Sequence, residues 1–165
     1  MAELSRRRLL SGQWRHRSDV IRPPWSCEPS LFTAGCTRCQ DCINACETGV
    51  LIAGSGGFPE INFQLAECTF CRKCADACEV QLFYPPQYQP WQHVVTFTAL
   101  CLALQGVECR SCQDSCETQA IRFRPRLGGI AQPTLDTAAC NGCGACVVGC
   151  PTMAIVITRS ENNEQ

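Results

Sequence analysis

The 165-residue sequence has no apolar run of 18 or more residues, so nothing in it predicts a membrane-spanning helix. It has only two histidines, His16 and His93, which makes zinc ligation by histidine a poor fit. It contains no nucleotide-binding motif and no pairing of a nucleophilic serine or cysteine with histidine, so we expect no enzymatic activity. Charged residues make up 18% of the chain and hydrophobic residues 45%, a balance that argues against intrinsic disorder.

Cysteine is present in excess, with 17 of the 165 residues. That share is typical of a fold built around its cysteines. Three groups repeat the spacing C-x2-C-x2-C-x3-C without a change: Cys36, Cys39, Cys42 and Cys46; Cys68, Cys71, Cys74 and Cys78; Cys140, Cys143, Cys146 and Cys150. A fourth, irregular group keeps the last three positions and has Gly106 in place of the first cysteine, with one more cysteine further upstream: Cys101, Cys109, Cys112 and Cys116. Cys27 is left over.

This spacing is typical of 4Fe–4S clusters. Three cysteines in steps of three direct their sulfurs toward one cluster, and the fourth cysteine ligates the neighbouring cluster. Disulfides impose no such spacing, and cysteines so close in sequence rarely reach the required Cα separation. Zinc usually takes two separated pairs of ligands. Iron–sulfur clusters are therefore the favoured reading, with zinc and disulfides as the alternatives.

The crossover of the fourth cysteine predicts which thiols meet. The expected sets are Cys36, Cys39, Cys42 and Cys78; Cys46, Cys68, Cys71 and Cys74; Cys116, Cys140, Cys143 and Cys146; and Cys101, Cys109, Cys112 and Cys150. We expect three clusters in the first three sets and a fourth cluster in the last, if Cys101 reaches into it. The alternative for the last set is an incomplete site that holds a labile or three-iron cluster.

The chain also carries an internal duplication. Cys39, Cys42 and Cys46 recur 70 residues later, and the group that begins at Cys68 recurs 72 residues later. In each half, short strand-like runs lie between the two motifs and are expected to pair as a hairpin. These features predict an α+β fold of two tandem bacterial-type two-cluster ferredoxin-like units with short helices and small β-hairpins.

We divide the chain into five segments: a basic arm, a first unit, a linker, a second unit and a tail, at residues 1–28, 29–84, 85–100, 101–159 and 160–165. A unit of this size is too small to rely on a hydrophobic core alone. Cluster ligation is expected to supply the missing folding free energy, so metal-free protein should be largely unfolded.

The N-terminal segment indicates in which cellular compartment the protein resides. Arg6, Arg7 and Arg8 resemble the start of a twin-arginine export signal, but the residues that follow Leu10 are polar and basic instead of apolar. We therefore expect a cytoplasmic protein, and a reducing cytosol also argues against disulfides.

Charge is distributed unevenly along the chain. Residues 1–22 carry six arginines against two acidic residues, whereas residues 23–165 carry eight basic and thirteen acidic residues. The basic arm is either a solvated leader or a partner-binding segment, and nucleic-acid or anionic-membrane binding has the least support. The candidate partner-binding residues are Arg6, Arg7, Arg8, Leu9, Leu10 and Trp14.

Several of these features occur together in one known family. The arginine-rich leader, the segment Ile21-Arg22-Pro23-Pro24-Trp25, the irregular cysteine group and the run from Asn141 to Cys146 resemble the ferredoxin-type accessory proteins of periplasmic nitrate reductase systems, a polyferredoxin family. The resemblance covers nearly the whole chain. It implies a cytoplasmic protein that contacts the precursor of the molybdenum-containing catalytic subunit of periplasmic nitrate reductase before export. It further implies a role in maturation of that subunit, by assembling or reducing its 4Fe–4S cluster. The alternative is a general one-electron carrier between redox partner proteins.

Overall fold

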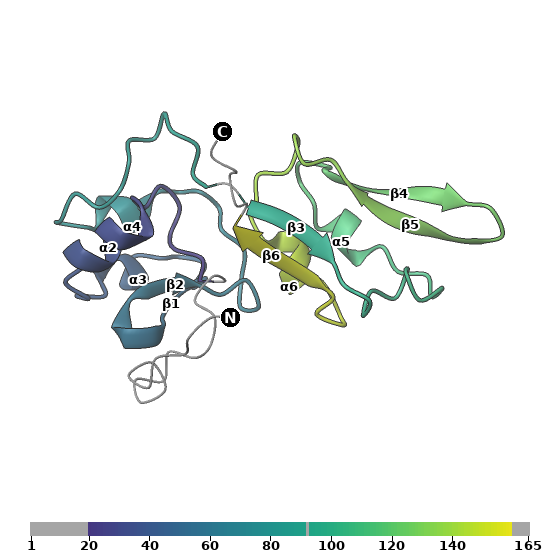
Figure 1. Ribbon diagram of the computed structural model, residues 1–165, viewed down its shortest axis with the longest axis horizontal. Helices are drawn as coiled ribbons and strands as arrows, with labels where there is room; N and C mark the ends of the chain where they lie inside the picture. The colour runs from purple at the N-terminus through teal and green to yellow at the C-terminus, as the bar shows by residue number, and fades with distance from the viewer. Residues whose placement is uncertain (1–19, 92, 160–165) are drawn as a thin grey trace, which may run out of the picture.

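The computed structural model describes residues 20–91 and 93–159, which form two lobes joined side by side (Figure 1). The candidate partner-binding residues between Arg6 and Trp14 and the C-terminal tail lie outside the described residues. No helix in the described part of the chain is both long and apolar enough to cross a membrane.

The first lobe consists of short helices and one hairpin. Its helices are α2 (Pro29–Gly35), α3 (Asp41–Asn44) and α4 (Lys73–Asp76). Strands β1 (Leu51–Ala53) and β2 (Pro59–Ile61) pair antiparallel, and the 3-10 turn η2 (Ser55–Gly57) connects them. The expected hairpin between the two cysteine motifs is confirmed.

The second lobe repeats this plan. Helices α5 (Ser111–Asp114) and α6 (Ala145–Val148) correspond to α3 and α4, and strands β4 (Ile121–Arg126) and β5 (Gly129–Leu135) form the equivalent hairpin. A second antiparallel pair joins β3 (His93–Phe97) to β6 (Ile155–Arg159).

Strand β3 lies inside the segment that we expected to be a linker, residues 85–100. It pairs with β6 because its apolar residues continue the core of the second lobe, where Val95, Ile155 and Ile157 are all buried. In the first lobe an isolated antiparallel bridge between Ser26 and Phe83 occupies the equivalent place. The duplication therefore includes a strand or bridge that closes each lobe.

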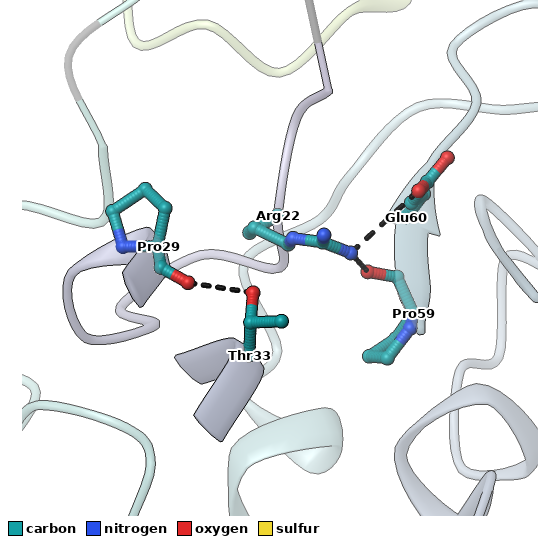
Figure 2. A network of polar contacts seen from close by, with 5 residues as sticks. All are labelled: Arg22, Pro29, Thr33, Pro59 and Glu60. Carbon is teal, nitrogen blue, oxygen red and sulfur yellow. Dashed lines mark hydrogen bonds and ion pairs between the residues drawn. The ribbon is translucent and has the colours of Figure 1, made fainter. Parts of the chain in front are cut away.

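The described end of the basic arm packs against the first lobe. Arg22 donates a 3.0 Å hydrogen bond to the carbonyl of Pro59 and lies 3.6 Å from the carboxylate of Glu60, as Figure 2 shows. Nearby, the hydroxyl of Thr33 donates to the carbonyl of Pro29 within α2 (Figure 2). Arg22, within the segment 1–28 that we predict to be an arm, thus contacts the first lobe.

The hydrophobic core is small and contains cysteines. The third cysteine of each group is buried on one of the one-turn helices α3, α4, α5 and α6: Cys42, Cys74, Cys112 and Cys146. The core of each lobe is therefore organised around thiols.

The two lobes meet at the cysteine loop that precedes α6. Gly144 has a positive φ of 86°, and a Cβ atom at this position would overlap the Phe63 ring of the first lobe. Beside it, the Trp91 indole donates a 3.1 Å hydrogen bond to the carbonyl of Asn141. The backbone N–H of Cys68 donates a 2.8 Å hydrogen bond to the carbonyl of Cys143. A glycine at residue 144 is therefore needed both for the turn and for the close approach of the lobes.

Candidate metal centres

The first of the four expected sets surrounds one hollow in the first lobe. Its thiols, which we call site 1, are those of Cys36, Cys39, Cys42 and Cys78. The hollow has a volume of about 580 Å³, part of which is open to solvent. Helix α2 ends just before Cys36, and α4 ends just before the turn that delivers Cys78 from the other motif. The crossover that the spacing predicts therefore brings these four residues together.

The irregular set also surrounds one hollow in the second lobe. We call it site 4, and it consists of Cys101, Cys109, Cys112 and Cys150. A turn carries Cys101 into this group, closed by hydrogen bonds from Gln105 to the Cys101 carbonyl and from Val107 to the Leu102 carbonyl. Gly106 adopts a φ of 84° in that turn. The loss of the regular first cysteine is thus offset by a longer loop.

The remaining two sets are recognised from the electrostatic interactions between their thiols. Site 2 comprises Cys46, Cys68, Cys71 and Cys74, and site 3 comprises Cys116, Cys140, Cys143 and Cys146. Burial raises the pKa of Cys74 to about 12, and the other three thiols of site 2 add to this rise. Burial likewise raises the pKa of Cys146 to about 12, with further contributions from the three thiols of site 3 and from Cys112.

The loops that present these thiols share one backbone conformation. In each intact motif the residues immediately before and after the second cysteine have positive φ: Arg38 and Gln40, Phe70 and Arg72, Gly142 and Gly144. Non-glycine residues rarely adopt this conformation, and such strain concentrates at functional sites. In the irregular group the corresponding residue, Arg110, has a φ of −132°, so this loop follows a different path.

Four buried thiols can all ionise in one site only beside a positively charged group. Burial, and then the neighbouring thiols, raise the pKa of Cys42 to about 12 and that of Cys112 to about 11. Four thiolates can share such a space only if a cation offsets their repulsion and replaces lost hydration. Within the described residues, no three His, Cys, Asp or Glu side chains lie close enough together to hold a single metal ion. A cubic iron–sulfide core holds its ligands farther apart than one ion does, so the donors and hollows fit such a core.

A threonine two residues after the fourth cysteine is a feature that the cysteine spacing did not reveal. The Cys46 and Cys116 sulfurs lie 3.6 Å from the hydroxyls of Thr48 and Thr118, and the same contact of 3.8 Å joins Cys150 to Thr152. Burial acts to raise the pKa of these three thiols, but hydrogen bonds from the threonine and from backbone N–H groups lower it overall.

Site 1 is the exception to this pattern. Val80 replaces the threonine, and the Cys78 thiol donates to the Val80 carbonyl at 2.9 Å. In the sequence these contacts correspond to the pattern Cys-x-Thr, which begins at the last cysteine of three of the four groups.

The four sites follow one another through the molecule. Cys74 of site 2 acts electrostatically on Cys42 of site 1, and α3 packs against α4. The hydrogen bond between Cys68 and Cys143 joins site 2 to site 3. Helices α5 and α6, which carry Cys112 and Cys146, join site 4 to site 3. The order along this row is therefore site 1, site 2, site 3 and site 4.

Cys27 belongs to none of these sites. It is half-buried, and burial raises the pKa of its thiol. Its backbone N–H bonds to the carbonyl of Leu82, and its side chain lines neither of the two hollows.

Comparison with known proteins identifies the same two halves. Models of the 4Fe-4S dicluster domain match residues 35–83 and residues 107–162. Each matched segment contains one motif pair and thus spans one lobe.

Similarity also extends over nearly the whole chain. The ferredoxin-type protein NapF of Haemophilus influenzae is 48% identical over 171 residues, which cover 98% of this chain and 97% of that protein. The ferredoxin-type protein NapF of Escherichia coli K12 is 54% identical over 153 residues, with 93% of each chain covered. An uncharacterised protein of Haemophilus influenzae is 33% identical over 93% of this chain.

Proposed function

This chain belongs to the family of ferredoxin-type NapF proteins, and on that premise we propose that it is a cytoplasmic polyferredoxin that acts in maturation of the catalytic subunit of periplasmic nitrate reductase before export. The cytoplasmic location is supported by the arginine-rich leader, which lacks a following apolar segment. The link to nitrate reductase rests on the family resemblance.

The sixteen cysteines of sites 1 to 4 would hold four 4Fe–4S clusters, one at each site. A bound cluster supplies reversible storage of one electron. The protein's own residues would set the surroundings of that electron: the buried third cysteines place each site inside a lobe, and the Cys-x-Thr hydroxyls contact a thiol of sites 2, 3 and 4. The remaining thiol, Cys27, has no part in this scheme.

The observation that carries the proposal is the position of the arm's described end beside site 1. The Arg22 guanidinium lies 5.8 Å from the centre of the Phe32 ring and bonds to the Pro59 carbonyl. Phe32 and Pro59 both line the hollow of site 1. A client held by the candidate residues between Arg6 and Trp14 would therefore be tethered within a short chain length of site 1.

The alternative function is a general one-electron carrier between redox proteins. The row of four sites serves that role equally well, because adjacent sites allow electrons to move through the molecule. A carrier without a dedicated client has no need of an arginine-rich arm rooted beside one site. We therefore rank client maturation first.

Pull-down of the nitrate reductase precursor from a cytoplasmic extract tests the proposal. Deletion of residues 1–19 should abolish capture and lower the active fraction of the client, whereas removal of residues 160–165 serves as a matched control. The deletion stops short of Arg22, so the contacts with Pro59 and Glu60 remain. If the arm-deleted protein captures and matures the client as well as the full chain does, the client-maturation proposal is wrong and the general carrier is favoured.

A further inference from the structure

The hairpin of β4 and β5 extends from the second lobe at the end of the molecule opposite the first lobe (Figure 1). Its strands contain six and seven residues, whereas β1 and β2 contain three each. Both hairpins follow the same position of the duplicated motif. Because the first lobe gathers its thiols with a short hairpin, the extension in the second lobe is not needed to position the thiols.

The extension is basic in an otherwise acidic body. Arg122, Arg124 and Arg126 are exposed on β4, and residues 118–135 contain no Asp or Glu. Their partners across the hairpin, Thr134, Gln132 and Gly129, are uncharged. None of the three arginines forms an ion pair with another described residue. The rest of residues 23–165 carries five basic against thirteen acidic side chains, so this hairpin is where an acidic partner meets least repulsion.

The hairpin also carries an apolar tip. The Leu127 side chain is fully exposed at the turn that joins the two strands. Arginine is enriched at protein interfaces relative to the rest of the surface, and the Leu127 side chain would add apolar contact area beside the arginines.

The base of the hairpin is part of site 4. Phe123 on β4 lines the hollow that Cys101, Cys109, Cys112 and Cys150 surround. The guanidinium of Arg110 lies 5.7 Å from the centre of the Phe123 ring. A protein that binds the arginines of β4 is thereby placed next to site 4, at the end of the row opposite the arm.

We propose that this hairpin is the docking surface for an acidic one-electron carrier protein that supplies electrons at site 4. One electron leaves the reduced centre of the partner and is accepted at site 4, without proton transfer or a change in covalent bonds. The proposal rests on the proposed function for the presence of a redox group at site 4. To the proposed function it adds the class of protein that donates the electron and the site at which the electron enters.

A protein fits this surface better than an extended polyanion does. The three arginines lie on one strand, and the exposed acidic residues Glu117 and Asp136 flank the hairpin directly. Nucleic acid or an anionic membrane would have to cross this negative surface, whereas a compact acidic patch need contact only the hairpin.

Stopped-flow reduction of the full-length holoprotein by reduced flavodoxin, an acidic carrier, tests the proposal. The variant Arg122→Gln/Arg124→Gln/Arg126→Gln should be reduced about tenfold or more slowly at low salt, and its rate should depend weakly on ionic strength. The variant with Lys at the same three positions keeps the charge and should stay near the wild-type rate. Methyl viologen radical, a small cationic reductant, should reduce all of them at similar rates. A further variant, Gln132→Glu, leaves the arginines in place and neutralises Arg124 from across the hairpin, and it should slow reduction by flavodoxin as well.

An equal rate for the wild type and the Gln variant would overturn the proposal, as would a Lys variant as slow as the Gln variant. It is also overturned if the wild type takes electrons from methyl viologen and none from flavodoxin, or if the arginines affect only binding to RNA or anionic vesicles. Capture of the nitrate reductase precursor should be unchanged in the Gln variant, so that assay reports on the proposed function separately.

Discussion

The backbone N–H of Cys68 donates a 2.8 Å hydrogen bond to the carbonyl oxygen of Cys143, and this bond joins a cysteine of site 2 to a cysteine of site 3 across the two lobes. Redox groups held at these two sites would be neighbours across the boundary between the lobes. The arm is rooted at one end of the row and the basic hairpin lies at the other. Under the two proposals above, this order of sites would form a path from a donor at site 4 to a client at site 1.

The junction between the lobes should be sensitive to the size of residue 144. In Gly144→Ala a Cβ atom would overlap Phe63, and the backbone would be strained at a φ of 86°. We expect the free energy of unfolding to fall by roughly 1 to 3 kcal/mol. We also expect a weaker magnetic interaction between the reduced clusters of sites 2 and 3, measured by electron paramagnetic resonance. Gly128→Ala is the matched control, because Gly128 also has a positive φ but has open space around it. Equal spectra for the two variants would show that the contact does not set the coupling.

Cys101→Ser should leave three complete 4Fe–4S clusters and either no cluster or a three-iron cluster at site 4. The Cys101 thiol completes site 4 from outside the regular motif, and a serine oxygen is a poorer iron ligand than a thiolate. Iron content should fall by about one quarter, or by about one iron if a three-iron cluster remains. Cys27→Ser is the control and should leave the iron content unchanged. An unchanged iron content in Cys101→Ser would exclude Cys101 from the site.

Thr152→Val should lower the reduction potential of the cluster at site 4. The hydroxyl hydrogen bond to Cys150 favours the more negative, reduced state, so its loss makes reduction harder. A difference of about 0.5 to 1 kcal/mol between the redox states corresponds to roughly 20 to 45 mV for one electron. Val80→Thr is the converse variant, because it places a donor beside Cys78 of site 1 and should raise that potential. Redox titration followed by electron paramagnetic resonance measures both, and shifts of the opposite sign would refute the role of the hydroxyl.

Removal of iron should unfold the protein. The third cysteines Cys42, Cys74, Cys112 and Cys146 occupy the centres of the lobes. Without a bound group the lobes lose the interaction that offsets the entropy of ordering the chain. Circular dichroism after chelation should show loss of most secondary structure and no cooperative thermal transition. A stable, cooperative metal-free protein would contradict this prediction.

The cysteine spacing limits which thiols can meet, because a crossover between two motifs leaves few geometric choices, and the structure groups the thiols of sites 1 and 4 around one hollow each. It also predicted the duplicated hairpins. The pairing of β3 with β6 was not predictable, because a short apolar run after Pro90 does not specify which segment it packs against. The threonine contacts and the fit of Gly144 against Phe63 depend on loop conformation and on lobe packing, which local sequence patterns do not specify.

Iron and acid-labile sulfide analysis of the anaerobically purified full-length protein tests the central claim, that sites 1 to 4 each hold a 4Fe–4S cluster. The expected result is about sixteen irons and about sixteen sulfides per chain, with a brown colour that is lost as the clusters decay in air. A colourless protein that contains zinc, or one with no more than about eight irons after anaerobic purification, would contradict it.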